Sequence, residues 1–240
     1  MAKKIRVGTL ISGGGTNLQA IIDAALNNSI DAKIVFTGSD NPGVKGLERA
    51  QKANIDTFVV DYSKIIKSCK KEGIKDIDLP EDFNLQEIES KQKLFEPGTS
   101  KEQIDFFLKS RAIAEKQLLD KIVAYDMDLL VLAGFMRVLT PYFIDRINIE
   151  PEKRRIMNIH PALLPAFPGT DGYGDTFAYG CKIGGCTVHY IDYGEDTGPI
   201  IGQKAFEIED HDTLDDIKAK GLKKEWALYP RCIQKFAERC

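Results

Sequence analysis

An amide, an imidazole and a proline stand close together in Asn158-Ile159-His160-Pro161. The segment 155–160 is expected to form a strand that Pro161 ends. Because successive strand side chains point to opposite faces, Asn158 and His160 should project to the same side. An amide can donate a hydrogen bond to a developing oxyanion, and an imidazole can carry charge or transfer a proton. The pair predicts a catalytic site at a strand end. The alternative is that His160 has a purely structural role.

An acidic partner for the histidine is expected in the segment 192–199, Asp-Tyr-Gly-Glu-Asp-Thr-Gly-Pro. Its composition is typical of a turn. One acid that faces His160 would favour the charged imidazolium. The residues by themselves leave the choice open among Asp192, Glu195 and Asp196, and the remaining acids are expected to be solvated.

A glycine-rich loop, Ser12-Gly13-Gly14-Gly15-Thr16-Asn17, lies between an apolar segment and an amphipathic one. Glycines let the backbone approach an anion, and a helix N-terminus offers free amide donors. Leu18 occupies the third glycine position of a dinucleotide fingerprint, and no lysine follows as in a P-loop. The loop favours a single phosphate over a pyrophosphate, with a simple tight turn as the structural alternative.

The elements around these motifs alternate between strand and helix patterns. Strands are expected at 5–11, 32–37, 57–60, 128–133, 155–160, 183–191 and 200–208, and helices at 17–26, 44–53, 100–124, from the Thr140 cap and Pro141 onward, and at 213–237. This order predicts an α/β fold: a Rossmann-like, mostly parallel twisted sheet with helices on both faces. Ligands of such sheets bind beyond the carboxyl ends of the strands, where the motifs fall.

The chain is expected to be one domain over 1–240 with a charged insertion at about 62–100. The insertion should lie largely on the surface and offer few apolar residues to bury, so that the core fold does not need it. The stretch 170–180 receives no role from its sequence.

Composition excludes several function classes. The net charge of −3, without a charged tail, gives no electrostatic case for binding nucleic acid or an anionic membrane. No segment approaches the roughly 20 apolar residues of a membrane span, and a cytoplasmic monomer or homodimer is expected. The five scattered cysteines suggest reduced thiols. Cys181, Cys186 and His189 raise the question of zinc, but no second cluster completes a site, so no metal is expected.

Several motifs together resemble the folate-dependent formyltransferases. These are Asn158-Ile159-His160-Pro161 with Leu163-Leu164-Pro165, and Asp196-x-Gly198-Pro199-Ile200 further on. The glycine loop, Leu132 to Leu139 and Glu225-x-Ala227-Leu228-Tyr229-Pro230 resemble the branch of that family whose acceptor is glycinamide ribonucleotide. The resemblance implies the formyltransferase fold and a step of de novo purine biosynthesis. In that step the ribonucleotide amine attacks the formyl group of 10-formyltetrahydrofolate directly, through a tetrahedral intermediate. The folate is a cosubstrate, and no tightly bound cofactor is implied.

The resemblance also implies residue roles. The catalytic residues would be Asn158, His160 and Asp196; the substrate-binding residues would be Gly15, Thr16, Asn17 and Glu225. The folate-binding residues would be Arg111 (25 positions before Met136), Met136, Arg137, Val138, Leu139, Asn158, Asp192, Tyr193, Gly194, Glu195 and Asp196. Three features depart from the family pattern: the long insertion, the stretch 170–180, and Leu222 where some relatives have a polar substrate contact.

Four other functions fit parts of the pattern. A formyltetrahydrofolate hydrolase and a methionyl-tRNA formyltransferase share the Asn-x-His core, but the phosphate loop and the lack of an extra RNA-binding domain argue against both. A non-catalytic folate or nucleotide binder would not need Asn158, His160 and Asp196 together. Leu18 argues against a dinucleotide-dependent reductase.

Overall fold

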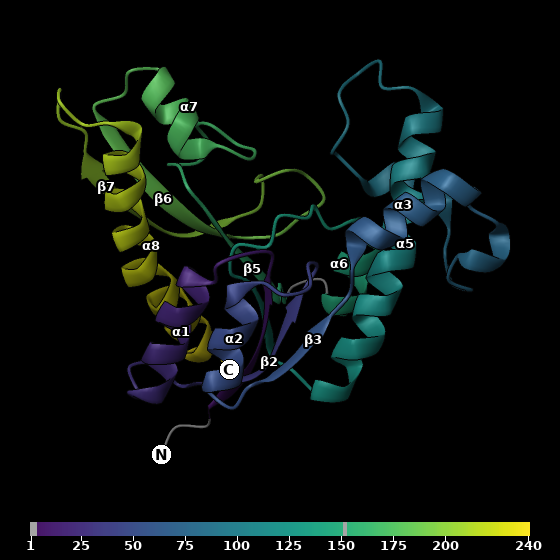
Figure 1. Cartoon of the computed structure of the whole chain (residues 1–240), viewed down its shortest axis with the longest axis horizontal. Coiled ribbons are helices and arrows are strands. Elements are labelled where there is room, and N and C mark those ends of the chain that lie inside the picture. The colour runs from purple at the N-terminus through teal and green to yellow at the C-terminus, as the bar shows by residue number, and fades with distance from the viewer. Residues whose placement is uncertain (1–3, 151–152) are drawn as a thin grey trace.

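One seven-stranded sheet organises the molecule in this computed structural model, which describes residues 4–150 and 153–240 (Figure 1). The strands are β1 (Ile5–Ile11), β2 (Ala32–Ser39), β3 (Asp56–Val59), β4 (Leu129–Leu132), β5 (Ile156–His160), β6 (Ile183–Tyr190) and β7 (Ile200–Glu207). Their order is β3-β2-β1-β4-β5-β6-β7. β1 to β5 pair in parallel, whereas β6 is antiparallel to both of its neighbours, β5 and β7. The predicted mostly parallel α/β sheet is confirmed.

Helices cover both faces of this sheet. They are α1 (Thr16–Leu26), α2 (Lys45–Lys52), α3 (Tyr62–Glu72), α4 (Leu85–Lys91), α5 (Lys101–Ile122), α6 (Pro141–Ile147), α7 (Gly172–Ala178) and α8 (Leu214–Ala237), with short 3-10 turns at Asp76–Asp78 and Val123–Tyr125. Figure 1 shows α1, α2 and α8 grouped on one side and α5 and α6 on the other. Val7 and Leu10 of β1 belong to the two separate cores, as alternation predicts. None of the helices in the described ranges combines the length and apolarity of a membrane span.

The chain reverses its direction across the sheet at β1. It runs outward from β1 through β2 to β3 and then returns to β4, which pairs with the other edge of β1. Ser12, after β1, donates its amide to the Gly134 carbonyl at 2.9 Å, and the Met136 amide donates to the Ser12 hydroxyl at 2.8 Å. The loops after β1 and β4 therefore flank the crevice where open α/β sheets bind ligands.

The insertion at 62–100 is more deeply packed than its charge suggested. Tyr62 is fully buried in the core beneath α5, and Ile88 is 5% exposed. Ile88 packs with Leu108 of α5 and Tyr142 of α6, together with partly buried aromatic side chains. The expectation of few apolar residues to bury is wrong at these positions, because charged residues cover only the outer face of the segment.

Thr140 stands at the N-cap of α6 before Pro141, as predicted, but its side chain does not cap the helix. Its hydroxyl and amide both donate to the carboxylate of Glu115, a fully buried residue of α5. Burial outweighs these hydrogen bonds and raises the pKa of Glu115 to about 8. The contact fixes the end of the segment 136–139 on α5.

Candidate active site

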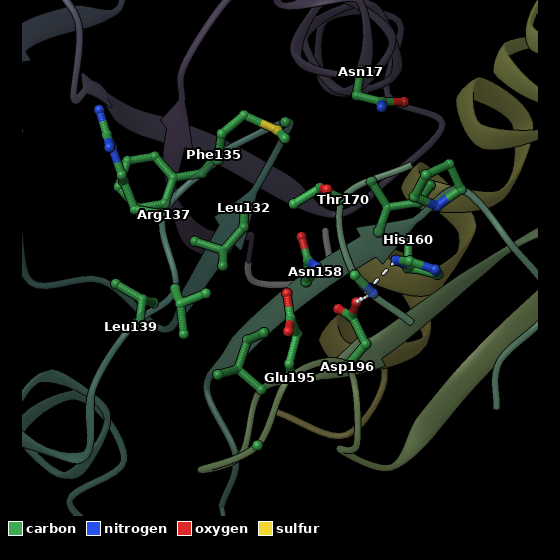
Figure 2. Close-up of a pocket in the computed structure, with 18 of the residues that line it drawn as sticks. Asn17, Leu132, Phe135, Arg137, Leu139, Asn158, His160, Thr170, Glu195 and Asp196 are labelled. Atoms are coloured by element: carbon green, nitrogen blue, oxygen red, sulfur yellow. Dashed lines mark hydrogen bonds and ion pairs between the residues drawn. The ribbon is translucent and has the colours of Figure 1, made fainter. Parts of the chain in front are cut away.

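Asn158 and His160 both face one cavity of about 250 Å³ beyond the carboxyl ends of β4 and β5 (Figure 2). They project to the same side of β5, as the strand period predicted. The residues that line the cavity are Asn17, Leu132, Gly134, Phe135, Met136, Arg137, Val138, Leu139, Asn158, Ile159, His160, Pro161, Gly169, Thr170, Ile191, Asp192, Gly194, Glu195, Asp196 and Glu225. The cavity thus brings together segments that lie far apart in the sequence, among them 132–139, 158–161 and 192–196.

The ring of His160 is placed between two hydrogen-bond acceptors. Its Nδ1 lies 3.1 Å from Oδ2 of Asp196, and its Nε2 lies 2.7 Å from the carbonyl oxygen of Phe167. A carboxylate and a carbonyl can only accept, so both ring nitrogens carry protons in this geometry. Burial alone would lower the pKa of His160, but the hydrogen bond and charge of Asp196 outweigh it and raise the pKa above its usual value. The site therefore favours an imidazolium.

Of the three candidate acids, Asp196 is the one that contacts His160. Asp192 instead accepts hydrogen bonds within its own turn, from the Gly194 amide and the Thr197 hydroxyl. Burial would raise the pKa of Asp196, but hydrogen bonds from His160, His189 and the Gly169 amide hold that pKa well below its usual range. Asp196 therefore stays ionised beside the imidazolium. Its backbone lies in the left-handed region at φ 54°, a strained conformation that often marks functional positions.

A second histidine supports this pair, and the sequence did not predict its role. His189 lies opposite Asn158 in the β5–β6 register and is fully buried. Its Nδ1 donates to the Tyr190 carbonyl at 3.0 Å. Its Nε2 lies 3.4 Å from both the Asn158 amide nitrogen and Oδ1 of Asp196. The antiparallel pairing of β5 with β6 is the signal that would have found it.

His189, with Cys181 and Cys186, is also the group at which the sequence raised the question of zinc. Within the described residues, no group of three His, Cys, Asp or Glu side chains could hold a metal ion. All five cysteines are free, and burial raises the pKa of Cys186 to about 12. A thiol with that pKa is a poor nucleophile at neutral pH.

Hydrogen-bond acceptors also gather where α1 and α8 border the cavity. Glu225 of α8 is 5% exposed and accepts from the Asn17 amide nitrogen and from the Tyr173 hydroxyl, each at 2.6 Å. Because the Asn17 nitrogen faces the carboxylate, Oδ1 of Asn17 is left buried without a partner among the described residues. This end of the cavity suits a ligand that carries hydroxyl or amino donors.

Tyr173 comes from the stretch 170–180 to which the sequence assigned no role. It lies on α7, whose close packing depends on two glycines. A Cβ at Gly221 of α8 would lie 2.2 Å from the Tyr173 ring, and a Cβ at Gly172 would lie 2.8 Å from the Pro161 carbonyl. α7 is therefore held between α8 and the loop after β5, where it brings the Tyr173 hydroxyl to Glu225.

The glycine loop leads directly into α1, as predicted. Gly15 has φ 69°, and no side chain caps the helix. A Cβ at Gly15 would lie 2.7 Å from Cα of Gly46, whereas Gly13 and Gly14 have open space around them. A free helix N-terminus suits an anion. Gly15 and Thr16 lie outside the cavity lining, next to Asn17, so a ligand in the cavity must extend past Asn17 to reach their amides.

Seven residues predicted to bind folate line the cavity besides Asn158 and Asp196. They are Met136, Arg137, Val138, Leu139, Asp192, Gly194 and Glu195. Nε of Arg137 pairs with the buried carboxylate of Asp40, and its Nη2 donates to the Ser63 hydroxyl at 3.1 Å. Figure 2 shows Leu132, Phe135, Arg137 and Leu139 grouped on the side of the cavity opposite His160. Arg137 is therefore held in place from both the turn after β2 and the insertion.

Two predicted folate contacts, Arg111 and Tyr193, lie outside the cavity lining. The Arg111 guanidinium lies over Phe107 and Tyr62, 5.0 and 5.6 Å from their ring centroids. Its Nε and Nη1 are buried and have no hydrogen-bond partner within the described ranges. The Tyr193 hydroxyl turns away and donates to Asp145 of α6. Sequence spacing could not give these side-chain directions, because tertiary packing sets them.

Comparison with known proteins gives consistent matches. A profile described as formyl transferase matches residues 5–233. Phosphoribosylglycinamide formyltransferase of Bacillus subtilis is 32% identical over 225 residues, which are 94% of this chain and 91% of that protein. The protein of the same name from Escherichia coli is 31% identical over 98% of this chain and 88% of its own length. The structure of glycinamide ribonucleotide transformylase 1 from Symbiobacterium toebii superimposes with a TM-score of 0.72 and 33% identity, over 99% of this chain and 90% of that chain.

Proposed function

This chain belongs to the formyl transferase family, and on that basis we propose that it transfers the formyl group of 10-formyltetrahydrofolate to the amine of glycinamide ribonucleotide in purine synthesis. The observation that carries the proposal is the His160–Asp196 pair beside Asn158, in a cavity that also presents the acceptors Asn17 and Glu225. The folate acts as a cosubstrate. The whole chain, insertion included, acts as one domain.

The proposed reaction is a direct displacement at the formyl carbon. The acceptor amine forms a bond to that carbon, and a tetrahedral oxyanion develops. Asn158 and the His160 imidazolium stabilise its charge; one such donor is typically worth about 10²–10³ in rate. The bond from the formyl carbon to the folate nitrogen then breaks. That nitrogen gains the Nε2 proton of His160, which leaves the Phe167 carbonyl, and the proton lost by the amine returns to His160. Because the amine is itself the nucleophile, no covalent enzyme intermediate forms.

The two substrates would approach His160 from opposite ends of the cavity. The ribonucleotide phosphate would bind the free amides at Gly15, Thr16 and Asn17, and its donor groups would reach Glu225. The folate would lie along 136–139 and 192–196. The unpartnered Nε and Nη1 of Arg111 support a folate acceptor group nearby, because buried donors require partners.

An acceptor assay tests this proposal. The purified chain is given 10-formyltetrahydrofolate with glycinamide ribonucleotide, with initiator methionyl-tRNA, or with water alone, and release of tetrahydrofolate is followed. Rapid release is expected only with the ribonucleotide. The full rate in water alone would identify a hydrolase, and preference for the tRNA would identify the other transferase.

Asp196→Asn tests the acid in the same assay. The substitution should lower turnover, because it removes the charge that raises the pKa of His160. Asparagine has nearly the same shape as aspartate, so the fold should be kept. With a lower pKa, His160 loses its proton at lower pH. The alkaline limb of the turnover profile should therefore move to lower pH. Asp192→Asn is the matched control, since the Asp192 carboxylate accepts its hydrogen bonds from its own turn. If Asp192→Asn moves the profile and Asp196→Asn does not, Asp196 is the wrong acid.

A further inference from the structure

The insertion contacts the loop that carries Asp196. The amide of Lys93 donates to the Tyr193 carbonyl at 2.9 Å, and Lys93 forms an isolated parallel bridge with Gly194. Between Ile191 and Pro199, no backbone–backbone hydrogen bond runs to any other segment within the described residues. The other bonds of the loop are those within its own turn, those that the Asp196 carboxylate accepts from His160, His189 and the Gly169 amide, and the one from the Tyr193 hydroxyl to Asp145 of α6. The insertion therefore supplies the backbone anchor of this loop.

A shared anchor on α6 reinforces the contact. Nζ of Lys91 lies 2.8 Å from Asp145, and the Tyr193 hydroxyl donates to the other carboxylate oxygen of the same residue. Asp145 thus joins the insertion to the loop. A second ion pair, Arg146 with Asp82 at 2.6 Å, holds an earlier part of the insertion on α6. These part-exposed pairs direct the geometry more than they stabilise the fold.

The insertion is itself fixed, so it can hold the loop in place. Ile88, three residues before Lys91, is buried against Leu108 of α5 and Tyr142 of α6. The Leu94 amide donates to the Gln92 side chain at 2.8 Å. Because its neighbours are packed, the segment 91–94 loses little further conformational entropy when it bonds to the loop 192–196.

We propose that the segment 91–94 is a positioning element for the loop 192–196, and that the Lys93 amide thereby sets the affinity for the folate cosubstrate. That this ligand is the folate cosubstrate rests on the proposed function. Asn17 and Glu225, which would face the ribonucleotide, are held by hydrogen bonds to each other and to Tyr173, so we expect ribonucleotide binding not to respond to changes in the segment 91–94.

Lys93→Pro compared with Lys93→Ala tests this role. Proline removes the amide donor, whereas alanine keeps it and removes only the side chain. We expect Lys93→Pro to raise the KM and Kd for 10-formyltetrahydrofolate about two- to tenfold, the usual effect of one lost hydrogen bond. Lys93→Ala should stay within about twofold of the wild type, since Lys93 contributes its backbone. Neither variant should change the KM for the ribonucleotide. Amide hydrogen exchange in 192–197 should speed up in the proline variant only.

Two results would overturn the inference: equal folate KM values in the two variants, or a rise of both substrate KM values in Lys93→Pro. Should proline impair folding, Asp145→Ala breaks the shared anchor and must raise the folate KM without changing the ribonucleotide KM. If the wild-type chain transfers no formyl group, the proposed function fails, but faster exchange of 192–197 in Lys93→Pro alone still supports the contact. Unchanged exchange rejects it.

Discussion

His160→Ala is expected to reduce turnover by at least about 100-fold, from the combined loss of a general acid and an oxyanion donor. His160 is 2% exposed and holds two protons between Asp196 and the Phe167 carbonyl. Alanine supplies neither the charge nor the proton for the departing folate nitrogen. Turnover should be measured under saturation with both substrates, so that binding differences do not enter.

The substitution should change folate and ribonucleotide affinity much less than turnover. Calorimetric titration of each ligand provides that control, and far-ultraviolet circular dichroism shows whether the sheet survives. His189→Ala is a useful comparison, because it leaves His160 intact and removes a neighbour of Asn158 and Asp196. Near-normal turnover of His160→Ala in a folded protein would remove His160 from the catalytic role.

Glycinamide riboside, which lacks the phosphate, is expected to be a poorer acceptor by about 10²–10⁴ in kcat/KM. The reason is that two charge-assisted hydrogen bonds to backbone amides contribute about 3–6 kcal/mol. The formyl chemistry at Asn158, His160 and Asp196 would be common to all acceptors, so selectivity has to come from binding. Anchoring the phosphate at the uncapped start of α1 would hold the amine beside the formyl carbon.

Inorganic phosphate provides an independent measurement of the same site. It should inhibit competitively against the ribonucleotide and not against the folate, and added phosphate should partly restore transfer to the riboside. Equal rates with riboside and ribonucleotide would refute the phosphate loop while leaving the formyl chemistry at His160 intact.

The sequence by itself determined the order and type of the core elements. Strand and helix periods are local properties of a few consecutive residues, so β1 to β5 and α1, α5 and α8 could be read directly from apolar spacing. The shared face of Asn158 and His160 followed from the same period. The helix that begins after the glycine loop followed from its flanking patterns. All of these inferences require no knowledge of distant contacts.

Only the tertiary structure decided which side chains meet. Asn17 and Glu225 are separated by 208 positions, yet they share a hydrogen bond. The choice of Asp196 over Asp192 depends on the backbone path of a loop, and the sequence pattern of that loop allowed either acid. The insertion gave the sharpest difference. Its charged composition suggested a dispensable surface segment, but a few buried side chains and one backbone amide place it against the active-site loop. Backbone hydrogen bonds of this kind leave no residue signature, because every residue except proline carries the same amide.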